Sequence, residues 1–245
     1  MPTHEVQNQP PPLQDYDPFA LDLALAEGLR REGAAWAEAQ VSEFARRTAS
    51  REVIAWGFQA NENPPRLKTH DRFGNRIDEV EFHPAWHELM RLSVGNGVHS
   101  GPWREPREGA HVARAARMML VSQAEAGHGC PISMTYSAFP ALQRQPDLLE
   151  EWGPRIVSTS YDARALPAGE KRGVLVGMGM TEKQGGSDVR ANTTRAEPLG
   201  DGAYALTGHK WFCSAPMSDA FLVLAQAPRG LSCFLLPRFT PDGAR

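Results

Sequence analysis

The stretch GMGMTEKQGGSDVRANTT, residues 177–194, sets a glycine-rich loop directly behind a short apolar run. Gly185 and Gly186 are adjacent, and glycine allows both a positive φ and a close approach of the backbone to a ligand. The hydroxyl of Ser187 can donate to an anionic oxygen beside the backbone N–H groups of the same loop. This composition is typical of a loop that holds a phosphate or pyrophosphate group.

A second stretch, GHKWFCS at residues 208–214, supplies flat rings and a further hydroxyl. Phe212 offers an apolar face and Ser214 a hydroxyl, while Thr181 of the first stretch adds another. Together the two stretches suit a large planar cofactor with a pyrophosphate tail. An ordinary strand–loop–hairpin with core aromatics is the alternative that the motif shape alone leaves open.

The sequence around both stretches predicts β-strands. An apolar run lies at 174–180, two strands at 193–208 flank the turn Gly200-Asp201-Gly202, and further strands lie at 220–227 and 231–237. No helical segment alternates with these strands. We therefore expect a truncated antiparallel β domain over 173–245, incomplete at its C-terminal end because the last strand lies against the end of the chain.

Residues 20 to about 150 predict helices, because apolar residues recur there at helical spacing. Segments rich in Gly, Pro and Asn at 61–65 and 95–109 separate the helices. The fold class that follows is α+β: an extended arm over 1–19, an all-helical domain over 20–172 and then the β domain. The apolar stripes are Ala37, Val41, Phe44 and Ala45; Trp86, Leu89, Met90 and Val94; and Val112, Ala116, Met119 and Leu120.

Composition excludes several classes of protein. The net charge of −3 and the scattered basic residues argue against a dedicated nucleic-acid binder. The three cysteines form no C-x-x-C pair, which indicates reduced thiols in a reducing compartment. No apolar run approaches membrane-spanning length, and the polar, proline-rich N-terminus lacks the apolar region of a secretion signal. We expect a cytoplasmic protein with no membrane contact.

The sequence lacks several common motifs of cofactor-binding, catalytic and metal sites. The run that starts at Gly177 has Glu182 where the dinucleotide fingerprint G-x-G-x-x-G needs its last glycine. Neither a Walker A spacing nor a G-x-S-x-G nucleophile elbow is present. The eight histidines follow no zinc-binding pattern, so no metal site is expected.

The two stretches nevertheless resemble the signatures of one flavoprotein family. MTEKQGGSDV, residues 180–189, resembles the T-E-x-x-x-G-S-D signature of acyl-CoA dehydrogenases, and GHKWFCS resembles their G-x-K-x-W-I-T-N motif. Within that family, EFHPAWHELM at 81–90 and LSCFLLPRFTPDG at 231–243 resemble a subfamily of alkylation-response flavoproteins. The resemblance extends over nearly the whole chain beyond the N-terminal arm.

The resemblance implies FAD as the cofactor and assigns each matching residue a place around it. The backbone at Met178 and Met180 lines the dimethylbenzene and pyrimidine surroundings, and Thr181 hydrogen-bonds the pyrimidine edge. The loop of Gly185, Gly186 and Ser187 meets the pyrophosphate. Phe212 stands where the family has a Trp beside the ring, and Ser214 stands where a Thr hydrogen-bonds near N5.

Two departures from the family pattern bear on function. Phe212 in place of Trp loses an N–H group but keeps an apolar face. Lys183 and Gln184 replace the Pro-Gly or Pro-Ala of typical dehydrogenases, at the mouth where an acyl-CoA enters. This second departure puts ordinary acyl-CoA turnover in doubt.

The resemblance also implies where catalysis and assembly reside. The family's catalytic glutamate belongs to a C-terminal helical domain, so no catalytic residue is assigned here; the expected role of Glu182 is structural hydrogen bonding. An alkylation-response flavoprotein with weak dehydrogenase activity is favoured over a dehydrogenase of a short or branched acyl-CoA, and a helical–β interaction module is a third reading. The implied partners are acyl-CoA, DNA through the C-terminal domain, and further subunits of a homotetramer.

Overall fold

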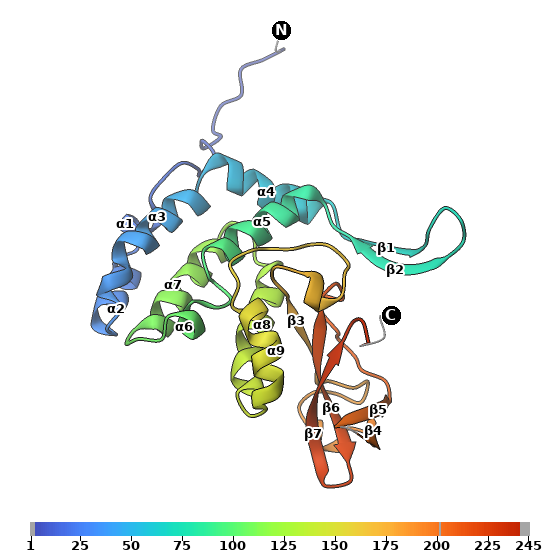
Figure 1. The fold of residues 1–245 in the computed structure, drawn as a ribbon. Coiled ribbons are helices and arrows are strands. Elements are labelled where there is room, and N and C mark those ends of the chain that lie inside the picture. Colours follow the sequence, from blue (N-terminus) through green and yellow to red (C-terminus); the bar gives the residue numbers. More distant parts are fainter. Residues whose placement is uncertain (1–2, 201, 241–245) are drawn as a thin grey trace.

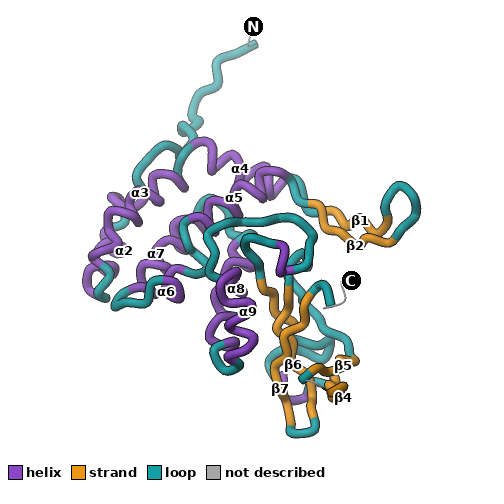
Figure 2. Tube along the Cα trace, in the orientation of Figure 1, coloured by secondary structure: helices purple, strands orange, loops and turns teal. Residues whose placement is uncertain are grey.

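The computed structural model describes residues 3–200 and 202–240, and they form a helical part joined to a β-sheet part (Figure 1). The N-terminal arm, from residue 3 to residue 17, contains no helix or strand and extends away from the helices (Figures 1 and 2). It is fastened near its end, where the backbone N–H of Asp15 donates to the carbonyl of Ala49 over 2.7 Å. The two parts follow one another along the chain, as the sequence predicts.

Local sequence signals begin several of the helices. The carboxylate of Asp22 accepts from Leu25 N–H at the start of α2, and Ser50 caps α4 in the same way through Val53 N–H. Pro84 opens α5, at a position where its missing N–H is not needed. The helices are α1 (Pro18–Leu21), α2 (Leu23–Arg31), α3 (Glu38–Thr48), α4 (Arg51–Glu62), α5 (Pro84–Gly95), α6 (Gly101–Arg104), α7 (Ala110–Ser122), α8 (Gly129–Leu142) and α9 (Pro146–Ile156), with 3₁₀ turns at Ala35–Ala37, Ala168–Glu170 and Val189–Ala191.

The predicted apolar stripes form the core of the helical part. Val41 and Leu120 lie in one buried cluster, which joins α2, α3 and α7. Met90 and Val94 lie in a second cluster, which joins α5 to the segment before the sheet. The prediction is wrong for one stripe residue, Met119. Its side chain is 55% exposed, because the buried face of α7 runs through Ala113, Ala116 and Leu120.

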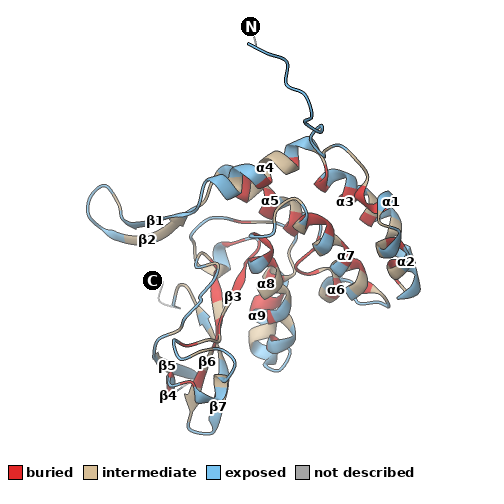
Figure 3. Cartoon of the chain, turned by 180° about the vertical axis from the view of Figure 1, so that it is seen from behind, coloured by how far each residue is buried: buried red, intermediate tan, exposed pale blue. Residues whose placement is uncertain are grey.

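The helical part is not all-helical, because a β-hairpin interrupts it. Strands β1 (Arg66–His70) and β2 (Arg76–Glu81) pair antiparallel and project from the ends of α4 and α5 (Figure 1). Asp71 shapes the turn by accepting from the backbone N–H groups of Phe73 and Asn75. Gly74 there has a φ of +87°. Both strands are largely exposed, so this hairpin lacks the apolar alternation that would have predicted it (Figure 3).

The predicted strands of the second part are all present. They are β3 (Val176–Gly179), β4 (Arg195–Gly200), β5 (Ala203–Thr207), β6 (Ala220–Ala227) and β7 (Gly230–Pro237). Of the predicted turn between β4 and β5, Asp201 lies outside the described residues, as do residues 241–245 of the expected β domain and residues 1–2 of the arm.

The sheet is mixed rather than antiparallel throughout. Its order is β3-β6-β4-β5, with β7 on β6, and β6 pairs parallel with β3 but antiparallel with β7. The sequence did not predict the parallel pairing of β3 with β6. About forty residues separate these two strands. That length allows the crossover that a parallel pair requires.

Helices α8 and α9 cover one face of this sheet. Ala138 and Ile156 pack there with Val176 and Leu222 in a third buried cluster. The hydroxyl of Thr135 in α8 also accepts from Val176 N–H at the start of β3. This contact fixes the strand whose far end carries the glycine-rich loop. In the part of the chain that the structure describes, no helix is long and apolar enough to cross a membrane.

Candidate functional site

The first loop of the site, residues 180–194, is held from within by Glu182. This side chain is buried, with 4% of its surface exposed. Its carboxylate accepts from the backbone N–H and the hydroxyl of both Thr193 and Thr194, over 2.6–3.0 Å. Glu182 therefore ties the beginning of the loop to its end, and its expected structural role is confirmed.

Glu182 remains ionised despite its burial. Desolvation raises the pKa of the carboxyl, but the hydrogen bonds from Thr193, Thr194 and Lys210 outweigh it and hold the pKa well below its usual range. The buried negative charge is also balanced directly, because Lys210 Nζ lies 3.0 Å from Glu182 Oε1.

Lys210 belongs to the second loop, residues 208–219, so this ion pair joins the two loops. A backbone contact runs beside it, where Trp211 N–H donates to the carbonyl of Thr181 over 2.9 Å. The two stretches singled out in the sequence therefore lie next to each other. They meet just beyond the end of β3.

The glycines of the first loop allow a tight turn against Thr181. Gly185 has a φ of +128°, and its N–H donates to the carbonyl of Glu182 over 2.9 Å. A Cβ on Gly186 would lie 2.7 Å from Thr181 Oγ1, so the threonine side chain lies directly against bare backbone. A larger residue at Gly186 would displace that hydroxyl.

The second loop presents an aromatic ring to solvent. Phe212 is 76% exposed and has a φ of +55°, an unusual backbone conformation for a bulky residue. The backbone N–H of Ser214 donates to the Phe212 carbonyl over 2.8 Å, which stabilises the bend, and the Ser214 side chain is exposed. A left-handed conformation at a large exposed residue is a feature that clusters at functional sites.

The remaining predicted residues lie on either side of this bend. The side chains of Met178 and Met180 are half-buried and pack against the cluster beneath the sheet. The Met180 carbonyl accepts from Asn192 Nδ2 over 2.9 Å. Ser187 is exposed on the first loop.

Sequence reasoning missed four residues that hold the site together: Asn192, Thr193, Thr194 and Lys210. Asn192, Thr193 and Thr194 follow one another directly before β4. A usable signal was present, because a buried acidic residue needs donors and the Thr-Thr pair precedes the next strand. Lys210 lies in the second motif, but only the fold shows that it reaches Glu182.

A second constellation resembles a catalytic triad but is closed to substrate. Ser93 Oγ lies 2.8 Å from His128 Nε2, and His128 Nδ1 lies 2.7 Å from Glu125 Oε2. Ser93 and His128 are both fully buried. Glu125 also accepts from the backbone N–H groups of Gly127 and His128, so these residues fasten the turn between α7 and α8 to α5.

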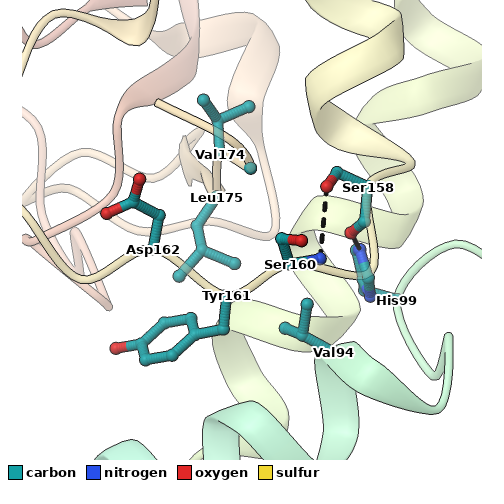
Figure 4. Close-up of a pocket in the computed structure, with 9 residues that line it drawn as sticks. Val94, His99, Ser158, Ser160, Tyr161, Asp162, Val174 and Leu175 are labelled. Atoms are coloured by element: carbon teal, nitrogen blue, oxygen red, sulfur yellow. Dashed lines mark hydrogen bonds between the residues drawn. The ribbon is translucent and has the colours of Figure 1, made fainter. Parts of the chain in front are cut away.

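A small cavity lies where the helical part meets the sheet (Figure 4). It has a volume of about 10 Å³, and Val94, His99, Tyr161 and Leu175 are among the residues that line it. His99 Nε2 donates to the Ser158 carbonyl over 3.0 Å, while no group among the described residues satisfies Nδ1. This space holds at most a water molecule. The described residues contain no cluster of His, Cys, Asp and Glu that could hold a metal ion.

Comparison with known proteins gives family matches over most of the chain. Residues 8–163 match the model described as the adaptive response protein AidB N-terminal domain. Residues 177–245 match the acyl-CoA dehydrogenase middle domain. These two segments correspond to the helical part and the sheet part.

Individual relatives agree with these matches. The chain is 53% identical to the AidB protein of Escherichia coli strain K12, over 99% of this chain and 45% of that protein. It is 32% identical to acyl-CoA dehydrogenase family member 11 of Caenorhabditis elegans, over 81% of this chain and 33% of that protein. The solved structure of Caenorhabditis elegans ACDH-11 with C11-CoA superposes with a TM-score of 0.82 at 28% identity, covering 100% of this chain and 43% of that one. The chain thus spans less than half the length of these relatives.

Proposed function

Because the chain belongs to the acyl-CoA dehydrogenase family, with an AidB N-terminal domain and an acyl-CoA dehydrogenase middle domain, we propose that its two adjacent loops bind FAD. The observation that carries the proposal is the meeting of the two loops through Glu182 and Lys210. That contact, with the hydrogen bond from Trp211 N–H to the Thr181 carbonyl, brings the glycine-rich loop next to the loop that carries the exposed Phe212 ring. Neither loop alone offers both a phosphate-binding backbone and an aromatic face.

The residues present fit such a cofactor. Bare backbone at Gly185 and Gly186 can approach a pyrophosphate, and the exposed hydroxyl of Ser187 can donate to it. The ring of Phe212 provides an exposed apolar face for a planar group. No buried unpaired charge in the described residues of the loops opposes binding, because Glu182 pairs with Lys210 and the buried Asp219 pairs with Lys171.

When bound, FAD supplies two-electron redox chemistry, and the protein supplies binding and orientation. Thr181 of the first loop and Ser214 of the second each supply a hydroxyl. The backbone of Met178 and Met180 lines the same end of β3. These residues orient a cofactor and shape its hydrogen bonding, and none of them is assigned as a catalytic acid or base.

For the function of the whole protein we infer a role in the response to DNA alkylation, with weak acyl-CoA dehydrogenase activity. The 53% identity to an AidB protein supports this reading over an ordinary dehydrogenase. Lys183 and Gln184, both exposed on the first loop, support it too, because typical dehydrogenases have smaller residues there. We also propose that the protein is cytoplasmic, assembles as a homotetramer and contacts DNA through a part that lies outside this chain. We further propose that the chain divides into an arm (1–19), a helical domain (20–172) and a β domain (173–245).

A second candidate function is dehydrogenation of an acyl-CoA as the main activity. The similarity to ACDH-11, whose structure contains C11-CoA, favours acyl-CoA as a ligand. Anaerobic mixing of isovaleryl-CoA with a protein that also carries the C-terminal helical domain separates the two candidates, because the family's catalytic glutamate belongs to that domain. Rapid loss of the flavin absorbance would support the dehydrogenase, and slow or negligible loss would support the alkylation-response reading.

Titration with FAD tests the proposed cofactor. We expect saturable binding of one FAD per chain, followed by the visible absorbance and quenched fluorescence of the flavin. Riboflavin, which lacks the pyrophosphate and adenosine, is the matched control and should bind more weakly. Absence of any FAD uptake would reject the proposal.

A further inference from the structure

We propose that Glu182 and Lys210 are positioning residues that couple the two cofactor loops and set the electrostatic potential at the flavin. This inference rests on the proposed binding of FAD. It concerns the two charges together, because they form one ion pair and both side chains are largely buried. The exposed fractions of the side chains are 4% for Glu182 and 11% for Lys210.

The pair is the point through which three segments of the chain are connected. Glu182 lies in the first loop, its hydrogen-bond donors Thr193 and Thr194 lead into β4, and Lys210 begins the second loop. The side chain of Lys210 also passes 3.6 Å from the position of a Cβ on Gly179, at the end of β3. Removal of the pair therefore loosens both loops relative to the strand that carries them.

Because both side chains are largely buried, removing one of them changes the electrostatic potential around the two loops. A buried ion pair contributes little net field at a distance, but one partner alone leaves a buried charge that water screens poorly. An unpaired ammonium beside the cofactor favours the electron-rich, reduced state. An unpaired carboxylate disfavours it. The two single substitutions should thus shift the flavin midpoint potential in opposite directions.

The test uses Glu182→Gln, Lys210→Met and the double variant, each titrated with FAD and then reduced at equilibrium against reference dyes. We expect each single variant to bind FAD roughly tenfold more weakly or worse, because the loosened loops must be ordered when the cofactor binds. We expect Glu182→Gln to have a more positive midpoint potential and Lys210→Met a more negative one. The double variant should return close to the wild-type potential, because it carries no unpaired charge.

The matched control is the exposed Lys68–Glu81 pair of the hairpin, where Nζ and Oε1 lie 2.8 Å apart. Lys68→Met and Glu81→Gln change the same charges far from the loops and should alter neither affinity nor potential. Shifts in the same direction for both Glu182→Gln and Lys210→Met, or no shift in either, would overturn the inference while FAD binding by the wild type stood. Failure of the wild type to bind FAD would instead reject the proposed function itself.

Discussion

Lys210 Nζ lies 3.0 Å from Glu182 Oε1, and this contact between residues 28 positions apart in sequence joins the two loops. The carboxylate also holds Thr193 and Thr194 at the entry to β4. Glu182, a buried residue that accepts hydrogen bonds from both threonines, therefore organises the candidate site. The first predictions concern this network and the groups around it.

Gly208→Ala should destabilise the protein by about 1–3 kcal/mol, the usual effect of overpacking. A Cβ at this position would lie 2.3 Å from Thr194 Oγ1 and 2.7 Å from Thr194 Cα, so the threonine must move away from Glu182. Denaturant unfolding monitored by tryptophan fluorescence measures the change. Gly28→Ala in α2 is the control, since nothing lies within 4 Å of its Cβ position. Equal free energies of unfolding for Gly208→Ala and wild type would show that the loop accommodates the added methyl group without cost.

Ser187→Ala should weaken FAD binding by about 1–3 kcal/mol, because it removes a donor to a charged phosphate group. Ser187 is exposed in the absence of cofactor, so its loss should leave the free energy of unfolding unchanged. Calorimetric titration gives the affinity. An unchanged dissociation constant would remove Ser187 from the pyrophosphate site.

Ser214→Ala should shift the midpoint potential or the reduction rate of the flavin more than its dissociation constant. Ser214 lies at the bend beside Phe212, where its hydroxyl can form a hydrogen bond to the flavin ring. Such a bond changes the redox potential of the flavin more than it changes the affinity of the protein for FAD. Potentiometric titration and FAD titration of the same protein separate the two effects. Identical redox behaviour in variant and wild type would exclude Ser214 from contact with the flavin.

Stability should fall as the pH is lowered from about 6.5 towards 4, partly because of His99. Burial lowers the pKa of His99 to about 4 from its ordinary value of 6.5. Between these values the unfolded chain binds a proton that the folded protein does not, so acidification favours unfolding, by roughly 3 kcal/mol at the limit. His99→Asn should flatten the dependence of unfolding free energy on pH, whereas His70→Gln on the hairpin should not. A slope that is the same in His99→Asn and wild type would contradict the assignment.

This chain should not bind duplex DNA with useful affinity. Its net charge is −3, and phosphate contacts require clustered Lys and Arg. A gel shift with random duplex at low salt is the measurement. A tight shift that weakens as salt is added would place DNA contacts within these 245 residues.

Much of the sheet part could be predicted from the sequence, because its strands are apolar runs bounded by turn residues. β6 matches the predicted segment 220–227, and β7 begins one residue before the predicted 231. The parallel pairing of β3 with β6 could not be predicted, since it depends on where a long connection returns. The hairpin of β1 and β2 was missed because its residues are exposed on both faces and carry no apolar period.

The sequence predicts the two loops of the candidate site but not the contacts that join them. Both loops were found from their glycines, hydroxyls and rings, and the structure brings Thr181 and Trp211 into contact. The donors to Glu182 come from two places in the sequence, Thr193-Thr194 and Lys210, and no local pattern predicts that they converge. The left-handed backbone of Phe212 was equally invisible, because bulky residues rarely adopt it.

Hydrogen exchange of the backbone amides with and without FAD tests the central claim most directly. The account predicts slower exchange on FAD addition in residues 178–187 and 210–214, with little change in α2, α3 or the hairpin. Protection of both segments together, reduced in both by Glu182→Gln, is the expected result. FAD uptake with no protection in either loop would contradict the account, because the cofactor would then lie elsewhere on the protein.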